Sequence, residues 1–293
     1  MLYFIVGPTG SSKTSISTKL SDMLNDAPIV NGDAFQIYQE MNIGTAKIEE
    51  DSPYFKRHYL INIKRPDENY SIMEYQKDFR KMVDELKKNY QDIIICGGSG
   101  LYIRSAIYDY KFEEKMNDVD MSDTDNLSNE ELYELLKELD VKSSNDIHPN
   151  NRKRVLRAIE IARTNSLNKS ENESLQKHEY IYPKEEIKIF FINPNREELY
   201  ENINRRVDKM IQDGLVDEVK YLLNKYHLSQ TASQAIGYKE IISYLNDEMD
   251  LESVIELIKK RSRNYAKRQI TFFKHQFETI EVNKASDILN YFR

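Results

Sequence analysis

The chain of 293 residues has 40% hydrophobic and 31% charged residues, which indicates a soluble globular protein of one large or two ordinary domains. No stretch approaches the ~20 apolar residues of a membrane span, and the N-terminal residues lack the basic region of a signal peptide. The single cysteine, Cys96, excludes an internal disulfide and fits a reducing compartment. We therefore expect a cytoplasmic protein without membrane partners, and a monomer. The net charge of −7 argues against a nucleic-acid binder unless positive charge is clustered locally.

The chain opens on a short apolar segment followed by a glycine-rich loop. Leu2–Val6 are all apolar, which predicts a fully buried strand of a parallel sheet. Residues 7–14 read Gly-Pro-Thr-Gly-Ser-Ser-Lys-Thr and nearly match the phosphate-binding pattern G-x-x-x-x-G-K-[ST]. Behind them apolar residues recur at helical spacing, namely Ile16, Leu20, Met23 and Leu24. This strand–loop–helix context favours phosphate binding.

The loop has the groups that phosphate binding requires. Backbone N–H groups at a helix N-terminus point toward an anion, Lys13 adds a positive charge, and the Thr14 hydroxyl can ligate a magnesium ion held by phosphates. Ser12 replaces the second glycine of the pattern, at a cost of about 1–2 kcal/mol if this position needs a positive φ. Gly10 can carry part of the turn. The alternative is a tight strand-to-helix turn with a solvated lysine.

A second strand is predicted at residues 27–30, and it leads into Asn31-Gly32-Asp33. A carboxylate just past the end of a strand lies on the side of an open α/β sheet where ligands bind. We therefore expect Asp33 to face the phosphate loop. The alternative is an aspartate that only caps a turn.

Further elements of an α/β core follow. Residues 58–63 alternate like a strand, and the capping-box pair Ser71 and Glu74 begins a predicted helix that continues to Tyr90. Residues 93–96 predict another buried strand. The glycine-rich turn at 97–100 that comes after it would line the same site.

From about residue 111 the character changes, first to an acidic and polar stretch at 111–127 and then to predicted helices. Ser128 and Glu131 form a second capping box, and His148-Pro149-Asn150-Asn151 introduces a helix with a cluster of basic residues. Residues 164–186, rich in Ser, Asn, Glu and Lys, predict a mobile connector. We therefore expect residues 113–186 to be an all-helical insertion between two parts of an α/β core, residues 1–112 and residues 187–293.

The second part of the core begins with the apolar strand Ile187–Ile192 and a helix capped by Asn195. Helices are predicted at 215–226 and 233–245, and a long one begins at Leu251. Basic residues follow one another across residues 259–274 with almost no acids between them, interleaved with aromatic residues. Such a run is either a solvated helix face or a surface that faces a polyanion, and the acidic remainder of the chain favours the second. No His/Cys cluster has metal-ligand spacing.

Taken alone, these residues fit a small-molecule kinase, a nucleotide-driven RNA binder, or a protein that uses the loop differently. Several longer strings resemble the tRNA dimethylallyltransferases, in order and over nearly the whole chain. They are the strings at 7–14, 31–38, 41–47 (Met-Asn-Ile-Gly-Thr-Ala-Lys), 97–102 (Gly-Gly-Ser-Gly-Leu-Tyr), 147–151 (Ile-His-Pro-Asn-Asn), 234–239 (Gln-Ala-Ile-Gly-Tyr-Lys) and 265–271 (Tyr-Ala-Lys-Arg-Gln-Ile-Thr).

The resemblance implies a P-loop NTPase-like parallel-sheet core whose loop holds the diphosphate of a prenyl donor and not ATP. It implies transfer of a dimethylallyl group from dimethylallyl diphosphate to N6 of an adenosine beside the tRNA anticodon, with Mg²⁺ as cofactor. The insertion and the basic helices would bind the anticodon stem–loop, with the target base flipped into a channel. Donor binding is expected from Gly7, Pro8, Thr9, Gly10, Ser11, Ser12, Lys13 and Thr14. Contacts with tRNA are expected from Asp33, Ala34, Phe35, Gln36, Ser99, Lys153, Arg154, Val155, Leu156, Arg157, Arg263, Lys267 and Arg268.

The chemistry of the proposed reaction fits the residues. An exocyclic adenine amine is a poor nucleophile and needs a base to take its proton, for which Asp33 is the candidate. The leaving diphosphate needs positive charge, which Lys13, the loop amides, Mg²⁺ and Arg206 can supply, and Thr9 can hydrogen-bond the diphosphate. The departures from the family pattern are Ser12, Ala34 in place of serine, Ser99 in place of threonine and Phe272 in place of tryptophan. None of them removes a reacting group.

Three rival functions remain. A phosphoryl-transfer enzyme would act on a small metabolite with ATP. A non-catalytic RNA-binding protein would carry a vestigial loop. A prenyltransferase could act on free AMP, although the insertion and the basic C-terminal helix argue against it.

Overall fold

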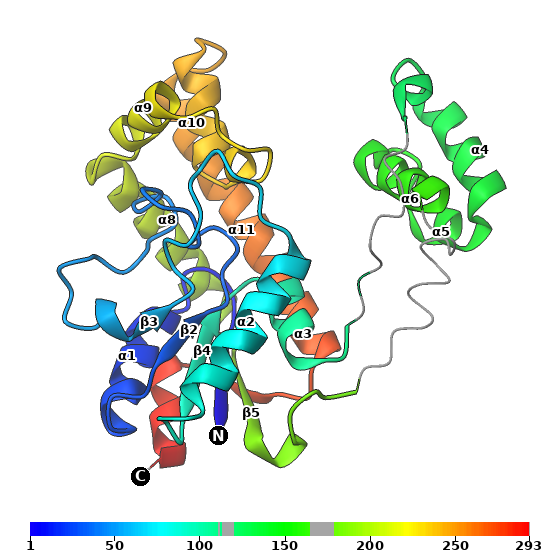
Figure 1. The fold of residues 1–293 in the computed structure, drawn as a ribbon. Coiled ribbons are helices and arrows are strands. Elements are labelled where there is room, and N and C mark those ends of the chain that lie inside the picture. Colours follow the sequence, from blue (N-terminus) through cyan, green and yellow to red (C-terminus); the bar gives the residue numbers. More distant parts are fainter. Residues whose placement is uncertain (111, 113–119, 165–178, 293) are drawn as a thin grey trace. The chain divides into compact units, whose positions relative to one another are not determined.

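The computed structural model describes residues 1–110, 112, 120–164 and 179–292, which form two compact units (Figure 1). The core unit comprises Met1–Ile107 and Tyr182–Arg293, and the helical unit comprises Tyr108–Ile181. The core unit is an α/β structure and the helical unit interrupts it in sequence. The predicted fold class is therefore confirmed.

The described residues of the core unit form a parallel six-stranded sheet with the order β3-β2-β4-β1-β5-β6. The strands are β1 (Leu2–Val6), β2 (Ile29–Asn31), β3 (His58–Tyr59), β4 (Ile93–Gly97), β5 (Ile187–Ile192) and β6 (Ile280–Val282). Val6 at the end of β1 is in register with Gly97 on one side and Phe191 on the other. The loops that follow these strands therefore meet at one edge of the sheet, where open α/β sheets bind ligands.

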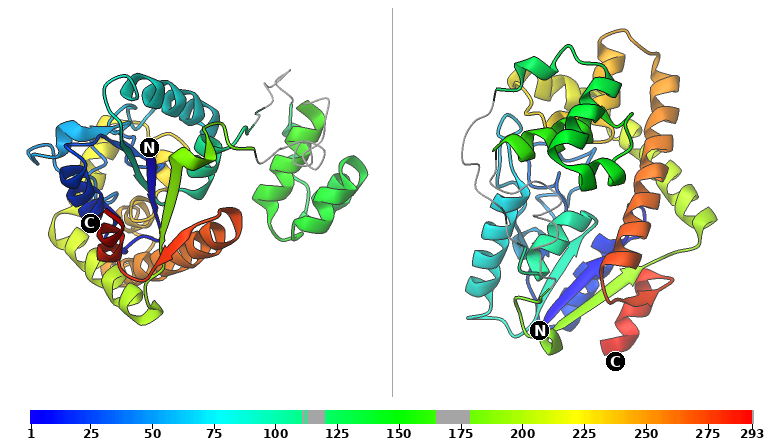
Figure 2. Two further views of the ribbon diagram at one scale, coloured as in Figure 1. Left: turned by 90° about the horizontal axis from the view of Figure 1, so that it is seen from below. Right: turned by 90° about the vertical axis from the view of Figure 1, so that its right-hand side faces the viewer.

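Helices cover both faces of this sheet. Those of the core unit are α1 (Lys13–Met23), α2 (Ile72–Leu86), α3 (Gly100–Ile107), α8 (Arg196–Gln212), α9 (Leu215–Lys225), α10 (Tyr238–Leu245) and α11 (Leu251–Gln276), with 3₁₀ turns at Phe55–Arg57, Lys184–Glu186, Ala232–Gln234 and Ala285–Phe292. Ile5 of β1 packs with Ile16 of α1 and Ile288 of the C-terminal 3₁₀ segment. Figure 2 shows α1 and this segment, in blue and red, lying together. On the other face the ring of Phe4 lies 6.4 Å from that of Phe79 in α2.

The two predicted capping boxes are confirmed. The Ser71 hydroxyl accepts from the N–H of Glu74, whose carboxylate accepts from the Ser71 N–H, and Ser128 and Glu131 repeat the arrangement. Such caps satisfy N–H groups that have no partner within the helix. Among the described helices, none has the length and apolar character of a membrane span.

Two predicted elements differ from the structure, and one strand was not predicted. The strand expected at 58–63 ends at Tyr59, because Leu60 and Asn62 have φ values of 57° and 53°, which extended backbone does not allow. The helix expected at 233–245 is a 3₁₀ turn followed by α10, because Gly237 with a φ of 99° separates them. Strand β6, which pairs with β5, was not predicted from the sequence.

The helical unit has its own small core. It contains α4 (Asn129–Leu139), α5 (Val141–Asp146), α6 (Arg152–Thr164) and a 3₁₀ turn at Ser122–Thr124. Leu132 and Leu136 of α4 pack against Val155 and Ile159 of α6. Most of the predicted connector at 164–186 lies outside the described residues.

Candidate active site

The phosphate loop, residues 7–14, leaves β1 and enters α1 in the conformation that its motif predicts. Gly10 has a φ of 80°, and Ser12 has a φ of 61° and a ψ of 26°, so the serine does occupy a left-handed position. Gly7 is needed for a close approach, because a Cβ there would lie 2.8 Å from the carbonyl oxygen of Ile192 in β5. The N–H groups of residues 10–14 donate no hydrogen bond within the described part of the chain. These groups are therefore free to bind an anion.

Two cationic side chains reach this loop without a carboxylate partner. The Lys13 ammonium donates to the Pro8 carbonyl at 2.6 Å, and Arg206 of α8 donates through Nη2 to the Thr45 carbonyl at 3.4 Å. The pKa of Lys13 is lowered to about 8, chiefly by burial; the Arg206 charge acts in the same direction, and Cys96 and Asp33 oppose it. Burial also lowers the pKa of Arg206. Within the described residues neither cation forms an ion pair, so a bound anion would stabilise both.

Asp33, just after β2, is held in place by hydrogen bonds. Its own N–H donates to Asn31 Oδ1 at 2.9 Å, and its Oδ1 accepts from the Phe35 N–H at 2.9 Å. The next residue, Ala34, donates its N–H to the Ser99 hydroxyl at 2.9 Å. Both interpretations of Asp33 therefore hold in part. One carboxylate oxygen caps the turn, while Oδ2 makes no hydrogen bond within the described chain and Asp33 lines the cavity.

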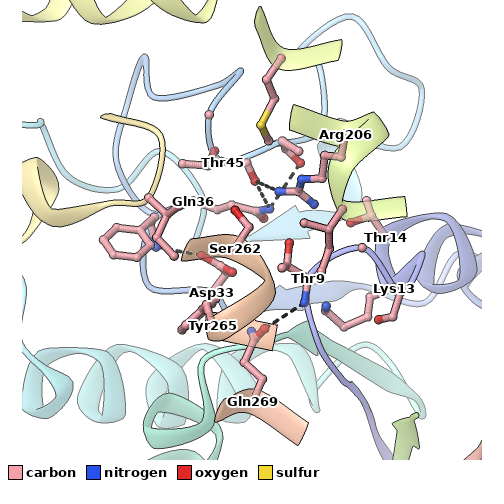
Figure 3. Close-up of a pocket in the computed structure, with 18 of the residues that line it drawn as sticks. Thr9, Lys13, Thr14, Asp33, Gln36, Thr45, Arg206, Ser262, Tyr265 and Gln269 are labelled. Carbon is pink, nitrogen blue, oxygen red and sulfur yellow. Dashed lines mark hydrogen bonds between the residues drawn. The ribbon is translucent and has the colours of Figure 1, made fainter. Parts of the chain in front are cut away.

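These side chains surround one cavity of about 600 Å³ (Figure 3). Asp33, Lys13 and Arg206 converge on it from β2, α1 and α8, and Tyr265 comes from α11. Burial and the nearby Asp33 charge raise the pKa of Tyr265 to about 12. The predicted residues that line the cavity are Thr9, Gly10, Ser11, Ser12, Lys13, Thr14, Asp33, Phe35, Gln36, Arg206 and Arg268.

On the side formed by α8 and α11, the cavity lining contains a group of apolar side chains among polar ones. It includes Ile203, Val207 and Met210 of α8 and Ile258 of α11. The cavity thus combines a cationic end at the phosphate loop with an apolar patch. Such a lining suits a ligand that has both an anionic group and a small apolar group.

Gln269 of α11 was missed by the sequence analysis as a site residue. It is 5% exposed, its Oε1 accepts from the Thr9 N–H at 2.9 Å, and its Nε2 donates to the Gly98 carbonyl at 2.8 Å. A Cβ at Gly98 would lie 2.3 Å from Nε2, and one at Gly100 would lie 2.2 Å from the Phe272 ring. The turn at 97–100 therefore requires glycine, because side chains of α11 pack directly against its backbone. Gln269 ties this turn to the phosphate loop.

A second missed group fixes the loop that carries Thr45. Glu218 of α9 accepts from the N–H groups of Asn42, Ile43 and Gly44 at 3.0, 2.8 and 3.3 Å. Its carboxylate also accepts from the Tyr238 hydroxyl at 2.6 Å. These bonds hold the segment at 42–45, and with it the Thr45 carbonyl that Arg206 contacts.

Lys47 secures the same loop from inside. Its ammonium donates to the carbonyl of Tyr38 and to the side-chain oxygens of Asn42 and Asn62. Burial lowers the pKa of Lys47 to about 8. The string at 41–47 that resembles the family is therefore a wall of the cavity rather than a set of reacting groups.

The cavity fits a metal ion only in combination with a phosphate ligand. The described residues contain no cluster of three His, Cys, Asp or Glu side chains that could hold an ion. Thr14 is exposed at the N-terminus of α1 and lines the cavity, with no hydrogen bond from its hydroxyl in the described chain. This donor set suits Mg²⁺, which commonly keeps several waters and is shared between few protein oxygens and the substrate phosphates.

The other predicted residues of the core unit are not among those that line this cavity. Ser99 and Ala34 bond each other, and Gly7 and Pro8 belong to the loop backbone. Arg263 donates to Asn204 at 2.6 Å, and Lys267 lies 6.0 Å from the Tyr200 ring. The basic run on α11 is partly neutralised, since Lys259 pairs with Asp208 and Arg261 with Glu240.

In the helical unit, the predicted tRNA-binding residues of α6 fall into two groups. Lys153 and Arg154 are exposed, and Arg157 is exposed but pairs with Glu160 at 2.6 Å. Val155 is fully buried and Leu156 packs against the same core. The side chain of Val155 is therefore not accessible to a ligand, contrary to expectation, because it stabilises the unit.

A parallel sheet with a phosphate loop after a central strand, and a carboxylate facing that loop, defines the class of phosphate-loop α/β proteins. The sequence model of the IPP transferase family matches residues 36–276. The tRNA dimethylallyltransferase of Bacillus licheniformis is 41% identical over 94% of this chain and 88% of its own length. The enzyme of that name from Staphylococcus carnosus is 40% identical over 99% and 93%.

A crystal structure agrees with these matches. The tRNA delta(2)-isopentenylpyrophosphate transferase of Staphylococcus epidermidis is 37% identical, with a TM-score of 0.69 over 99% of this chain and 98% of that one. The chain therefore belongs to the IPP transferase family of prenyltransferase enzymes, together with the tRNA dimethylallyltransferases, as its motifs predict.

Proposed function

We propose that this protein transfers the dimethylallyl group of dimethylallyl diphosphate to N6 of an adenosine adjacent to the anticodon of tRNA. The observation that carries the proposal is the cavity itself. Two partly buried cations without carboxylate partners, Lys13 and Arg206, and the free amides of the phosphate loop lie in one space with Asp33. The names of the relatives support tRNA as the acceptor. Such a substrate agrees with a cytoplasmic location, and we infer that the protein acts as a monomer.

In this proposal the cationic end of the cavity binds the diphosphate and stabilises it as it leaves. The C–O bond between the dimethylallyl carbon and the diphosphate breaks, and negative charge grows on the diphosphate oxygens. Lys13, Arg206 and the N–H groups of residues 10–14 are fixed around that position before the reaction begins. Donors that need no reorganisation lower the barrier most. The apolar patch of α8 receives the dimethylallyl group.

Asp33 removes the proton that the new bond displaces. The N6 nitrogen forms a C–N bond with the dimethylallyl carbon, and its proton passes to Oδ2 of Asp33. The bond from Phe35 N–H to Oδ1 keeps the carboxylate oriented. General-base catalysis of this kind typically contributes about 10²–10⁴-fold. The base must leave its stack to reach a carboxylate at the end of β2, and enzymes that act on nucleobases do this by flipping.

Mg²⁺ is proposed as the cofactor. Thr14 is the protein residue that would hold it, together with the diphosphate oxygens. When bound, the ion would neutralise charge on the leaving diphosphate.

The direct test is incubation of the protein with labelled dimethylallyl diphosphate and tRNA, followed by analysis of the nucleosides. The proposal expects one labelled adenosine derivative and release of diphosphate. Label found on free AMP but not on tRNA would favour the AMP prenyltransferase. Hydrolysis of ATP or transfer from it would favour a kinase, and tRNA binding without any product would favour a non-catalytic RNA-binding protein.

A further inference from the structure

Within the core unit, α8 and α11 pack side by side and exchange contacts along one seam. Tyr200 meets Lys267, Asn204 meets Arg263, and Asp208 meets Lys259. Residue numbers increase along α8 as those of their partners on α11 decrease, so the two helices are antiparallel. The seam therefore has two ends whose charges can be compared.

At the Asp208 end the positive charge is neutralised. Lys259 lies 2.8 Å from Asp208 and 3.0 Å from Glu256. A cation between two carboxylates has no net attraction for a distant anion. This end is an ordinary ion-paired surface.

At the opposite end the cations meet aromatic and amide groups instead. The Arg196 guanidinium lies 5.2 Å from the centre of the Tyr200 ring and its Nε donates to the Tyr200 hydroxyl at 3.2 Å. The Lys267 ammonium lies 6.0 Å from the same ring, and Arg263 donates to the Asn204 amide at 2.6 Å. Within the described chain none of these three cations pairs with a carboxylate.

Both Arg196 and Lys267 act on the Tyr200 hydroxyl. Its slight burial raises the pKa of the hydroxyl, but the hydrogen bonds and charges of Arg196 and Lys267 lower it overall. Arg196 and Lys267 are both exposed, so a ligand can reach them. In a chain with a net charge of −7, unpaired cations on one seam mark a surface for an anionic partner.

We propose that Arg196, Tyr200 and Lys267 form a phosphate-binding site for the sugar–phosphate backbone of the tRNA substrate. Both cations lie within about 6 Å of the centre of the tyrosine ring, and each is free to contact a phosphate oxygen. This inference rests on the proposed function for the identity of the RNA. It adds α8 to the interface, whereas the sequence motifs indicated only α6, α11 and the cavity.

The test measures binding of a fluorescently labelled tRNA transcript to the intact protein over a series of KCl concentrations. Arg196→Ala and Lys267→Ala should each reduce the slope of log K against log salt by about 0.7–0.9, the loss of one phosphate contact. Arg196→Lys should restore the slope. Lys259→Ala is the matched control, because it removes the same charge from the same seam at its neutralised end, and it should keep the wild-type slope. The thermal midpoint of each variant, and its affinity for inorganic diphosphate, report whether the core unit is intact.

The proposal is overturned if Arg196→Ala keeps the wild-type slope, or if Lys259→Ala lowers the slope equally, since the effect would then be one of overall charge. Labelling of tRNA by the wild-type protein, assayed in parallel, separates the two hypotheses. If the wild-type protein modifies tRNA but Arg196→Ala keeps the wild-type salt slope, the phosphate-binding site is contradicted and the proposed reaction is not. If the wild-type protein makes no product but the salt slope falls in Arg196→Ala, the proposed reaction is contradicted and a polyanion-binding surface is supported.

Discussion

Replacing Ser12 by glycine should raise the free energy of unfolding of the protein. Ser12 is exposed and lines the cavity. Ser12 lies in the left-handed region with a φ of 61°, which costs a residue with a Cβ about 1–2 kcal/mol. Its side chain makes no capping bond to α1, so removal of the hydroxyl loses no hydrogen bond. Glycine in turn gives the unfolded chain more freedom, which costs about 0.4–1 kcal/mol. The net gain expected is about 0.8 kcal/mol.

This gain can be measured by urea and thermal unfolding followed by far-UV circular dichroism, because the chain has no tryptophan. For a unit of this size about 0.8 kcal/mol corresponds to a rise of about 2 °C in the thermal midpoint. Affinity for inorganic diphosphate should not fall, since the loop has the same strain with and without ligand.

Asp247 provides the control for Ser12. It is exposed, has a φ of 59° and lies in the turn after α10, outside the cavity. Asp247→Gly should also raise the midpoint, but by less, because aspartate tolerates this conformation better than serine. It should have no effect on diphosphate binding. A lower midpoint for Ser12→Gly would refute the reasoning, because it would mean that the serine side chain stabilises the loop in another way.

Three further predictions concern the cavity. Asp33→Asn should reduce single-turnover prenylation of tRNA by about 10²–10⁴-fold and remove the carboxylate limb of its pH profile, whereas a near wild-type rate would leave Asp33 only its role in the turn. Gln269→Met keeps the shape but leaves the Thr9 N–H and the Gly98 carbonyl unpaired, so unfolding should become easier by about 1–3 kcal/mol. It should also weaken diphosphate binding more than an equally destabilising Phe273→Leu, and equal effects would exclude a positioning role. Burial lowers the pKa of Lys13 to about 8, and diphosphate favours its charged form. Measured relative to Lys13→Arg, so that the protonation of diphosphate itself cancels, affinity should be constant below pH 8 and fall by up to about tenfold per pH unit above it. Lys13→Arg, which stays charged, should lack this decline, and an identical decline would assign the titration to another group.

Much of the fold could be predicted because the relevant information lies within a few residues. Leu2–Val6 is buried in the sheet since a run of apolar side chains suits no other environment. Ser71 and Glu74 bond each other's backbone across one turn of helix, and that pairing depends on their spacing alone. The left-handed φ of Ser12 likewise follows from the loop pattern around it.

Other features depend on neighbours that are distant in sequence, and local patterns do not contain them. Gln269 accepts from Thr9, 260 positions away, and Glu218 holds backbone N–H groups about 175 positions away. Nothing in the sequence separates such a glutamine from one that faces solvent, because its hydrogen-bond partners are backbone groups, which every residue has.

The sequence by itself thus determined the phosphate loop, the parallel α/β core, the helical insertion and the acid that faces the loop. Only the tertiary structure decided which cations are free to act. Residues 259–274 carry one basic run in the sequence, yet Lys259 is neutralised by Asp208 of α8 while Lys267, two turns later, meets the Tyr200 ring. The charge that a side chain presents depends on what lies within a few ångströms of it, and packing of the two helices sets that distance.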